Sequence, residues 1–216
     1  MKWGDPMDIL AQIAEYLELG DDERVHDLTR QAIDAGLPPG DILHRGLIGG
    51  MNVVGEKFRV REIFLPDVLL AAKAMYAGMD LVKPLLVKES IPTRGTVVIG
   101  SVRGDLHDIG KNLVGIMLKG AGFDVVDLGA DVRPEAFVDA VVSERASIIG
   151  MSALLTTTMP VMKDVVDLVT ARGLRPSVKI MVGGAPVSAD FAREIGADAY
   201  AFDAASAVDR ARALIG

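Results

Sequence analysis

Apolar side chains recur at helical spacing over the first part of the chain. The pattern predicts four helices, at about residues 9–19, 22–35, 41–58 and 67–84, each with one apolar face. Asp21 precedes the second helix and is a candidate N-cap, because its side chain can accept a hydrogen bond from a free backbone N–H group. Gly20, Gly36 and the run Pro38-Pro39-Gly40 interrupt the pattern. Helices joined by such short connections predict a small four-helix bundle.

From about Thr93 the pattern changes to short apolar runs that alternate with amphipathic segments. Strands are predicted at 96–101, 124–128, 147–152, 179–182 and 198–201, and helices at 110–120, 134–144, 159–171, 188–195 and 205–214. Continuous apolar runs such as VVIG and IIGM are typical of parallel strands covered on both faces. The fold class is therefore α/β, with a flavodoxin-like, doubly wound, five-stranded parallel sheet after the bundle. We expect domains at 1–90 and 91–216, linked near residues 88–94 (KESIPTR).

Composition narrows the possible functions. A net charge of −7 argues against non-specific nucleic-acid binding, which needs a basic surface. The absence of cysteine excludes disulfides, thiolate metal sites and cysteine nucleophiles. The N-terminus has no signal-peptide pattern, and no uncharged stretch approaches the roughly 20 residues of a membrane span. We therefore expect a cytoplasmic protein that binds neither nucleic acid nor membrane.

Unusual sequence follows three predicted strands, at the edge where open α/β sheets bind ligands. The three loops are 101–110 (SVRGDLHDIG), 152–158 (SALLTTT) and 183–186 (GGAP). His107 is the group most able to do chemistry, since neutral imidazole is a good metal ligand and a nearby carboxylate, Asp105 or Asp108, can fix its tautomer. The alternative is a surface histidine beside helix-capping aspartates. A zinc or iron site is disfavoured, because His26 and His44 fall on the predicted bundle and the loops offer no further histidine.

Glycine and hydroxyl residues in the same loops would suit an extended ligand. Gly104 and Gly110 bracket the histidine, and Gly183-Gly184 would let a ligand approach the backbone where a Cβ would clash. The alternative is that these glycines belong to ordinary turns between strands and helices, which often contain glycine. Ser152 and the threonines of 156–158 could bond a ligand or simply cap the next helix. Neither nucleotide-binding fingerprint, G-x-G-x-x-G or G-x-x-x-x-G-K-[ST], occurs.

Together the three loops resemble the cobalamin-binding signature D-x-H-x-x-G … S-x-L … G-G. The matching residues are Asp105, His107 and Gly110, then Ser152 and Leu154, then Gly183 and Gly184. The family with this signature includes cobalamin-dependent methionine synthase, the base-off mutases and the small corrinoid proteins of methyltransferase systems. Segments 51–58 (MNVVGEKF) and 63–66 (IFLP) resemble the helical cap of the methyl-transferring members, which the mutases lack.

The resemblance implies a role for each matching residue. His107 would replace the dimethylbenzimidazole base as lower ligand of cobalt, Asp105 would bond its other nitrogen, and Thr158 would stand for the serine that completes this relay in methionine synthase. Residues implied to line the nucleotide tail or touch the corrin are Ser152, Leu154, Thr156, Gly183, Gly184 and Ala185, with Gly104, Leu106, Asp108 and Gly110 of the histidine loop. Phe58 and Leu65 would cover the methyl-bearing face, although periodicity alone favours a place in the bundle core.

The implied cofactor is cobalamin or a related corrinoid, whose cobalt alternates between methylcobalamin and cob(I)alamin. The implied function is that of a methyl carrier, not catalytic alone, which serves methylamine, methanol, betaine or methoxyarene demethylation. Its partners would be a substrate-specific methyltransferase, an acceptor methyltransferase using tetrahydrofolate or a thiol, and a reductive activation protein, with the linker as a hinge. A cobalamin sensor is the alternative, although such proteins normally carry a DNA-binding region ahead of the cap. A receiver-like signalling domain would leave the histidine unexplained.

Overall fold

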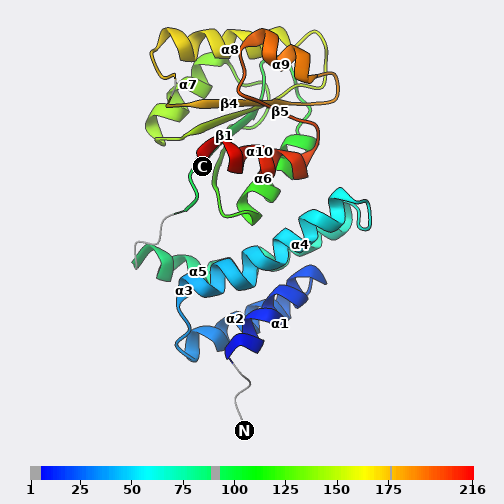
Figure 1. The fold of residues 1–216 in the computed structure, drawn as a ribbon, viewed down its shortest axis with the longest axis vertical. Coiled ribbons are helices and arrows are strands. Elements are labelled where there is room, and N and C mark those ends of the chain that lie inside the picture. Colours follow the sequence, from blue (N-terminus) through cyan, green and yellow to red (C-terminus); the bar gives the residue numbers. More distant parts are fainter. Residues whose placement is uncertain (1–5, 89–92, 176) are drawn as a thin grey trace. The chain divides into compact units, whose positions relative to one another are not determined.

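The computed structural model describes residues 6–88, 93–175 and 177–216, which form two compact units (Figure 1). The first is helical and contains the described residues up to 88 together with Gly120–Gly122. The second is α/β and contains Thr93–Lys119 and Phe123–Gly216. The domain boundary predicted at residue 90 and residues 89–92 of the predicted linker lie outside the described residues. Among the helices that are described, none is long and apolar enough to span a membrane.

The helical unit has the four helical segments that the apolar pattern predicts within residues 6–88. They are α1 (Pro6–Glu18), α2 (Asp22–Asp34), a continuous run of α3 (Pro39–Asp41), η1 (Ile42–Leu47) and α4 (Ile48–Arg59), and α5 (Leu65–Lys88). Asp21 caps α2 as expected, since its side chain accepts a hydrogen bond from the Arg24 N–H at 3.0 Å. Ile13, Leu17 and Val25 are among the fully buried side chains of this unit.

Two features of the helical unit differ from the pattern. The third segment contains a π-helical turn, η1, in which the Ile48 N–H bonds the Leu43 carbonyl, five residues back. The fourth helix does not stop near Pro84 but continues to Lys88. A proline inside a helix frees only the carbonyl four residues earlier, here that of Asp80, which lies at an exposed position that water can reach.

The α/β unit contains a parallel sheet of five strands within its described residues, in the order β2-β1-β3-β4-β5. The strands are β1 (Thr96–Ser101), β2 (Asp124–Asp127), β3 (Ile148–Ser152), β4 (Lys179–Gly183) and β5 (Ala199–Ala201). The helices are α6 (Ile109–Gly120), α7 (Pro134–Ser143), α8 (Pro160–Ala171), α9 (Ala189–Ile195) and α10 (Ala204–Ile215). In Figure 1, α7, α8 and α9 cover one face of the sheet, and α6 and α10 cover the other. This is the doubly wound arrangement expected from the sequence.

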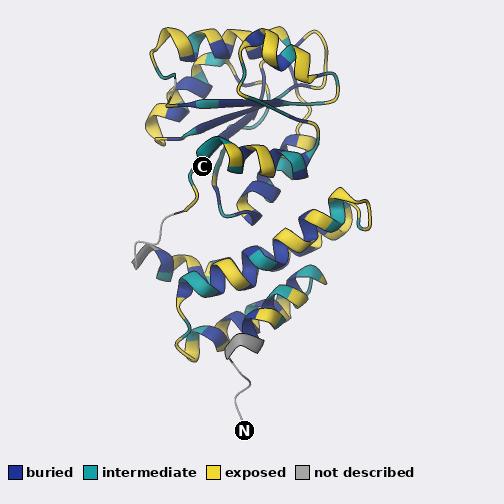
Figure 2. Cartoon of the chain, in the orientation of Figure 1, coloured by how far each residue is buried: buried dark blue, intermediate teal, exposed yellow. Residues whose placement is uncertain are grey.

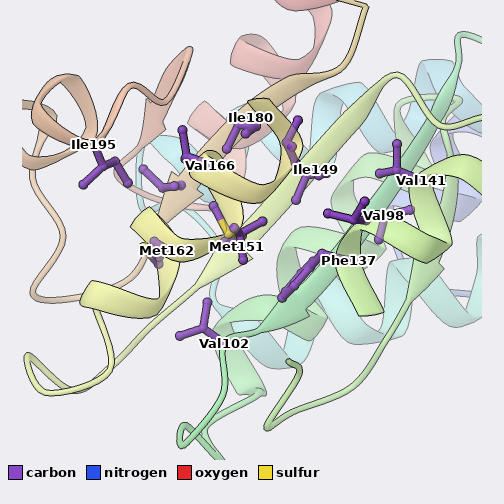
Figure 3. Packing of buried hydrophobic residues seen from close by; sticks show 14 of the residues in the cluster. Val98, Val102, Phe137, Val141, Ile149, Met151, Met162, Val166, Ile180 and Ile195 are labelled. Carbon is purple, nitrogen blue, oxygen red and sulfur yellow. The ribbon is translucent and has the colours of Figure 1, made fainter. Parts of the chain in front are cut away.

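The central strands are buried because both of their faces are covered. Figure 2 shows β1 and β4 largely dark blue; β1 and β3 are buried at all but one position each, and β4 is buried at its central positions. On the side of α7 and α8, the ring of Phe137 packs among Val98, Val141 and Met151 (Figure 3). This rigid core supports the carboxyl edge of the sheet, from which the three unusual loops leave.

Candidate functional site

The three loops start side by side at the carboxyl edge of the sheet. Ser101 ends β1 and pairs in register with Ser152 of β3, and Ser152 pairs in turn with Gly183 of β4. β1 and β3 are neighbours in the sheet, but the chain continues from β1 to β2 on one side and from β3 to β4 on the other. The carboxyl edge between β1 and β3 is therefore a switch point of the fold. The parallel sheet therefore brings together residues that are far apart in the sequence.

Asp105 is the buried centre of the site. Its donors to Oδ1 are the His107 Nδ1–H at 2.8 Å and the His107 backbone N–H at 3.1 Å. Its donors to Oδ2 are the Leu154 N–H at 2.7 Å, the Leu155 N–H at 3.2 Å and the Thr158 hydroxyl at 2.9 Å. Burial by itself raises the pKa of the Asp105 carboxyl, but these hydrogen bonds outweigh it and hold the pKa well below its usual range. Asp105 is therefore a carboxylate that only accepts hydrogen bonds at neutral pH.

This carboxylate decides the tautomer of His107. Because ionised Asp105 has no proton to donate, Nδ1 must carry the imidazole proton, and the lone pair of Nε2 is left to bind a metal. The His107 side chain is 53 % exposed, whereas the side chain of Asp105 is fully buried. The imidazole is therefore hydrogen-bonded to a buried group and is itself accessible at the surface. A histidine oriented by a carboxylate on its far nitrogen is the usual arrangement of a protein metal ligand.

Further residues hold the histidine loop in place, and the sequence reasoning missed them. The side chain of Asp131 accepts the Gly104 N–H at 2.7 Å, and the Asp131 N–H donates to the Asp105 carbonyl at 3.0 Å. Ser101 donates its hydroxyl to the His107 carbonyl at 2.6 Å. Lys111 is buried at the start of α6 and pairs with Asp127 at 2.6 Å. Asp127 is the last residue of β2 and Asp131 lies in the loop after it, so this fourth strand end, with its glycine and acidic residues, was a usable signal.

Three glycines of the site occupy their positions for different structural reasons. A Cβ on Gly184 would lie 1.9 Å from the Ala153 carbonyl oxygen at a φ of +126°, so the approach of the chain itself requires this glycine. Gly104 has a φ of +82° and is required by its turn. Gly110 differs, because it lies exposed in the first turn of α6 and a Cβ there would meet no atom within 4 Å. The open space beside Gly110 is therefore available to a ligand.

Exposed apolar side chains accompany the histidine. They come from the loops 101–110 and 152–158 and from the residue after β5, and are Leu106, Ile109, Leu154, Leu155 and Phe202. Leu106 and Ile109, on either side of His107, are 76 % and 73 % exposed. Apolar groups gathered around a metal-binding nitrogen favour a large, mostly apolar ligand that covers them. A corrinoid fits these residues: a free imidazole nitrogen for cobalt, an open glycine, and apolar side chains for the macrocycle.

The other residues expected at the site are distributed as follows. Thr158 is buried against Asp105, whereas Asp108, Thr156 and Ala185 are exposed in their loops and Ser152 is half-buried. Phe58 and Leu65 belong to the helical unit and are only partly buried there.

His44 lies exposed on η1. Among the described residues no group of three or more His, Cys, Asp or Glu side chains could hold a metal by itself.

Comparison with known proteins identifies the family. The sequence profile of a B12 binding domain matches residues 95–212, and that of another B12 binding domain matches residues 9–83. The chain belongs to the B12-binding corrinoid proteins. Its cofactor is cobalamin or a related corrinoid.

Several relatives match this corrinoid protein over most of their length. It is 40 % identical to the corrinoid protein DSY3155 of Desulfitobacterium hafniense, over 97 % of this chain and 99 % of the relative. It is 42 % identical to a trimethylamine corrinoid protein of Methanosarcina barkeri, over 96 % and 97 %. It is 46 % identical to dimethylamine corrinoid protein 1 of Methanosarcina acetivorans, over 83 % and 84 %.

Two solved structures also resemble this corrinoid protein. A chain in the methanol:cobalamin methyltransferase complex MtaBC from Methanosarcina barkeri superposes with a TM-score of 0.86 at 36 % identity, covering 96 % of this chain and 80 % of that one. A cobalamin-binding protein from Desulfitobacterium hafniense gives a TM-score of 0.79 at 32 % identity, over 96 % and 98 %.

Proposed function

We propose that this corrinoid protein carries a methyl group from a substrate-specific methyltransferase to an acceptor methyltransferase. The observation that carries the proposal is His107, whose Nε2 is free while its Nδ1 is held by the buried carboxylate of Asp105. Relatives named for trimethylamine and dimethylamine, and a similar chain within a methanol methyltransferase complex, support a methylamine or methanol as methyl donor. When bound, the corrinoid supplies a cobalt that can accept and release a methyl group.

The residues of the histidine loop would hold the cofactor from below. Nε2 of His107 would bind cobalt, and Asp105 would keep the proton on Nδ1 so that Nε2 stays a ligand. Thr158 would stabilise the charge of Asp105 through its hydroxyl. Protonation of Asp105 would weaken its pull on the Nδ1 proton and make Nε2 a poorer donor. Proton uptake by Asp105 and His107 would in this way favour release of the His107 imidazole from the metal.

The remaining residues would enclose the rest of the cofactor. The nucleotide tail would lie along the loops after β3 and β4, which contribute Ser152, Leu154, Thr156, Gly183, Gly184 and Ala185. Leu106, Asp108, Gly104 and Gly110 of the histidine loop would contact the macrocycle or the tail. Phe58 and Leu65 would shield the upper face from water, which protects a reactive methyl group.

The methyl carrier needs partners that reach the upper face. We assign one methyltransferase that supplies the methyl group, one that passes it to tetrahydrofolate or a thiol, and a reductive activation protein that restores the lowest oxidation state of the cofactor. Access would require the helical domain, residues 1–90, to move aside from the domain of residues 91–216 on the segment between them. We place the protein in the cytoplasm, where such partners work.

Reconstitution with hydroxocobalamin tests the role of His107. The wild-type protein should bind the cofactor with the benzimidazole displaced, and His107→Ala should lose the histidine-bound absorption spectrum. His44→Ala is the control, because His44 is an exposed histidine of the helical unit. A wild-type spectrum equal to that of the free cofactor would remove the basis of the proposal.

The carrier role is tested separately. Reconstituted and reduced protein should become methylated only when a methyltransferase for trimethylamine, dimethylamine or methanol is added together with its substrate. Cofactor binding that never leads to methylation with any of these pairs, or with betaine and methoxyarene systems, would favour the sensor alternative.

A further inference from the structure

We infer that Ser101 is a positioning residue that sets the direction of the His107 imidazole. The inference rests on the proposed function, because it concerns the residue assigned there as the cobalt ligand. Ser101 is the last residue of β1 and is fully buried. Its hydroxyl donates a hydrogen bond of 2.6 Å to the carbonyl oxygen of His107, six residues further along the chain. The bond closes the loop that carries the histidine.

Ser101 is itself firmly held. Its N–H donates to the Gly129 carbonyl at 3.0 Å, and its own carbonyl accepts the Val132 N–H at 3.0 Å. It also pairs in register with Ser152 in the centre of the sheet. The hydroxyl therefore acts from a rigid part of the molecule on an exposed loop.

Asp105 alone does not define where the imidazole points. Both hydrogen bonds from His107 to Asp105, one from Nδ1 and one from the backbone N–H, end on the same oxygen, Oδ1. Two bonds to one atom fix the distance of the residue from that atom but leave it free to swing about it. The bond from Ser101 reaches the other side of the same residue, at the carbonyl, and removes this freedom. Together, Asp105 and Ser101 define the place of Nε2.

The alternative explanation is that Ser101 is an ordinary core residue whose buried hydroxyl forms a hydrogen bond without orienting His107. The two explanations differ in what the loss of the hydroxyl does. Ser101→Ala fits the same space and keeps both backbone hydrogen bonds of the strand, so the fold should persist. His107 should become mobile, whereas a residue with only a core role would affect the whole α/β unit evenly. Ser101→Thr keeps the hydroxyl and should restore the behaviour of the wild type.

Two measurements test the inference. In the cofactor-free protein, the Nδ1–H proton of His107 is followed by nuclear magnetic resonance, and its exchange with water should be about tenfold faster in Ser101→Ala. In the protein loaded with cob(II)alamin, histidine labelled with the heavy nitrogen isotope gives a splitting in the electron paramagnetic resonance spectrum that differs from that of the benzimidazole base. This splitting reports the histidine-bound fraction, and that equilibrium should fall by about tenfold. Ser101→Thr should restore both values. Ser143→Ala, which removes an exposed hydroxyl of α7, is the control.

The outcomes are separable. Unchanged exchange and an unchanged histidine-bound fraction in Ser101→Ala would overturn the inference, as would a loss of amide protection spread over all strands that Ser101→Thr does not restore. Absence of a splitting from the labelled histidine nitrogen in the wild type would instead refute the proposed role of His107. The exchange of the Nδ1 proton in the cofactor-free protein would then still decide whether Ser101 positions the ring.

Discussion

Lys111 and Asp127 form an ion pair whose members differ in burial, and this difference predicts which substitution is more harmful. The Lys111 side chain is 3 % exposed, and its Nζ donates to both carboxylate oxygens of Asp127 and to Oδ1 of Asn112, each at 2.6 Å. The side chain of Asp127 is 38 % exposed and also accepts the Gly129 N–H at 2.8 Å. Asp127 is thus the group that balances the charge of the buried Lys111 ammonium. The Asp127 carboxylate, in contrast, is also reached by water and by a backbone N–H.

Asp127→Ala should destabilise the α/β unit by about 3–5 kcal/mol, because it leaves a buried ammonium group without a counter-charge. Lys111→Met should cost only about 1 kcal/mol, since methionine fills the space of the lysine stem and Asp127 remains hydrated. The double variant should be about 2 kcal/mol more stable than Asp127→Ala alone, because it removes the stranded charge.

Hydrogen exchange of the most protected β1 amides in the cofactor-free protein measures these free energies. At about 1.4 kcal/mol per factor of ten, Asp127→Ala should speed exchange by at least about 100-fold and Lys111→Met by about fivefold. The control is the pair Lys163–Asp167 on α8, whose side chains are 46 % and 60 % exposed, and there both single changes should cost below about 0.5 kcal/mol. Equal effects of Asp127→Ala and Lys111→Met would refute the reasoning from burial.

Three further substitutions test the site. The pKa of Asp105 is lower in the folded than in the unfolded protein, so the unfolded chain binds more protons between the two values and the stabilisation present at pH 7 is lost as the pH falls below about 4. The difference in urea midpoint between wild type and Asp105→Asn should therefore shrink toward pH 2, and a constant difference would contradict the charged state of Asp105. Gly110→Ala should leave the thermal midpoint unchanged or raise it slightly, since alanine favours helix by about 0.5–1 kcal/mol, yet weaken cobalamin binding in a titration. Gly184→Ala should instead lower the thermal midpoint of the cofactor-free protein, because its Cβ would meet the Ala153 carbonyl, and a native midpoint would contradict this.

The periodicity of apolar residues was sufficient to predict most elements of the fold. Strand β1 begins and ends where the pattern places it, and the other strands and the helices of the α/β unit agree within one or two residues. The cap at Asp21 was also readable, because capping depends only on neighbours in the chain. The π turn in η1 and the passage of α5 through Pro84 were not, since neither leaves a clear mark in the apolar pattern.

The sequence by itself also determined which groups lie in the loops at the carboxyl edge, because His107, Asp105 and the glycines of the motif are all in short segments at strand ends. Only the tertiary structure decided how these groups are held. Asp105 receives the N–H groups of Leu154 and Leu155 because β1 and β3 are neighbours, although the residues are 49 and 50 positions apart. The partners of Ser101 and Lys111 also became known only from the tertiary structure. From residue type alone, Ser101 would be an ordinary hydroxyl of the core and Lys111 an ordinary surface lysine. Hydrogen bonds and burial depend on which strands pair, and local periodicity does not carry that information.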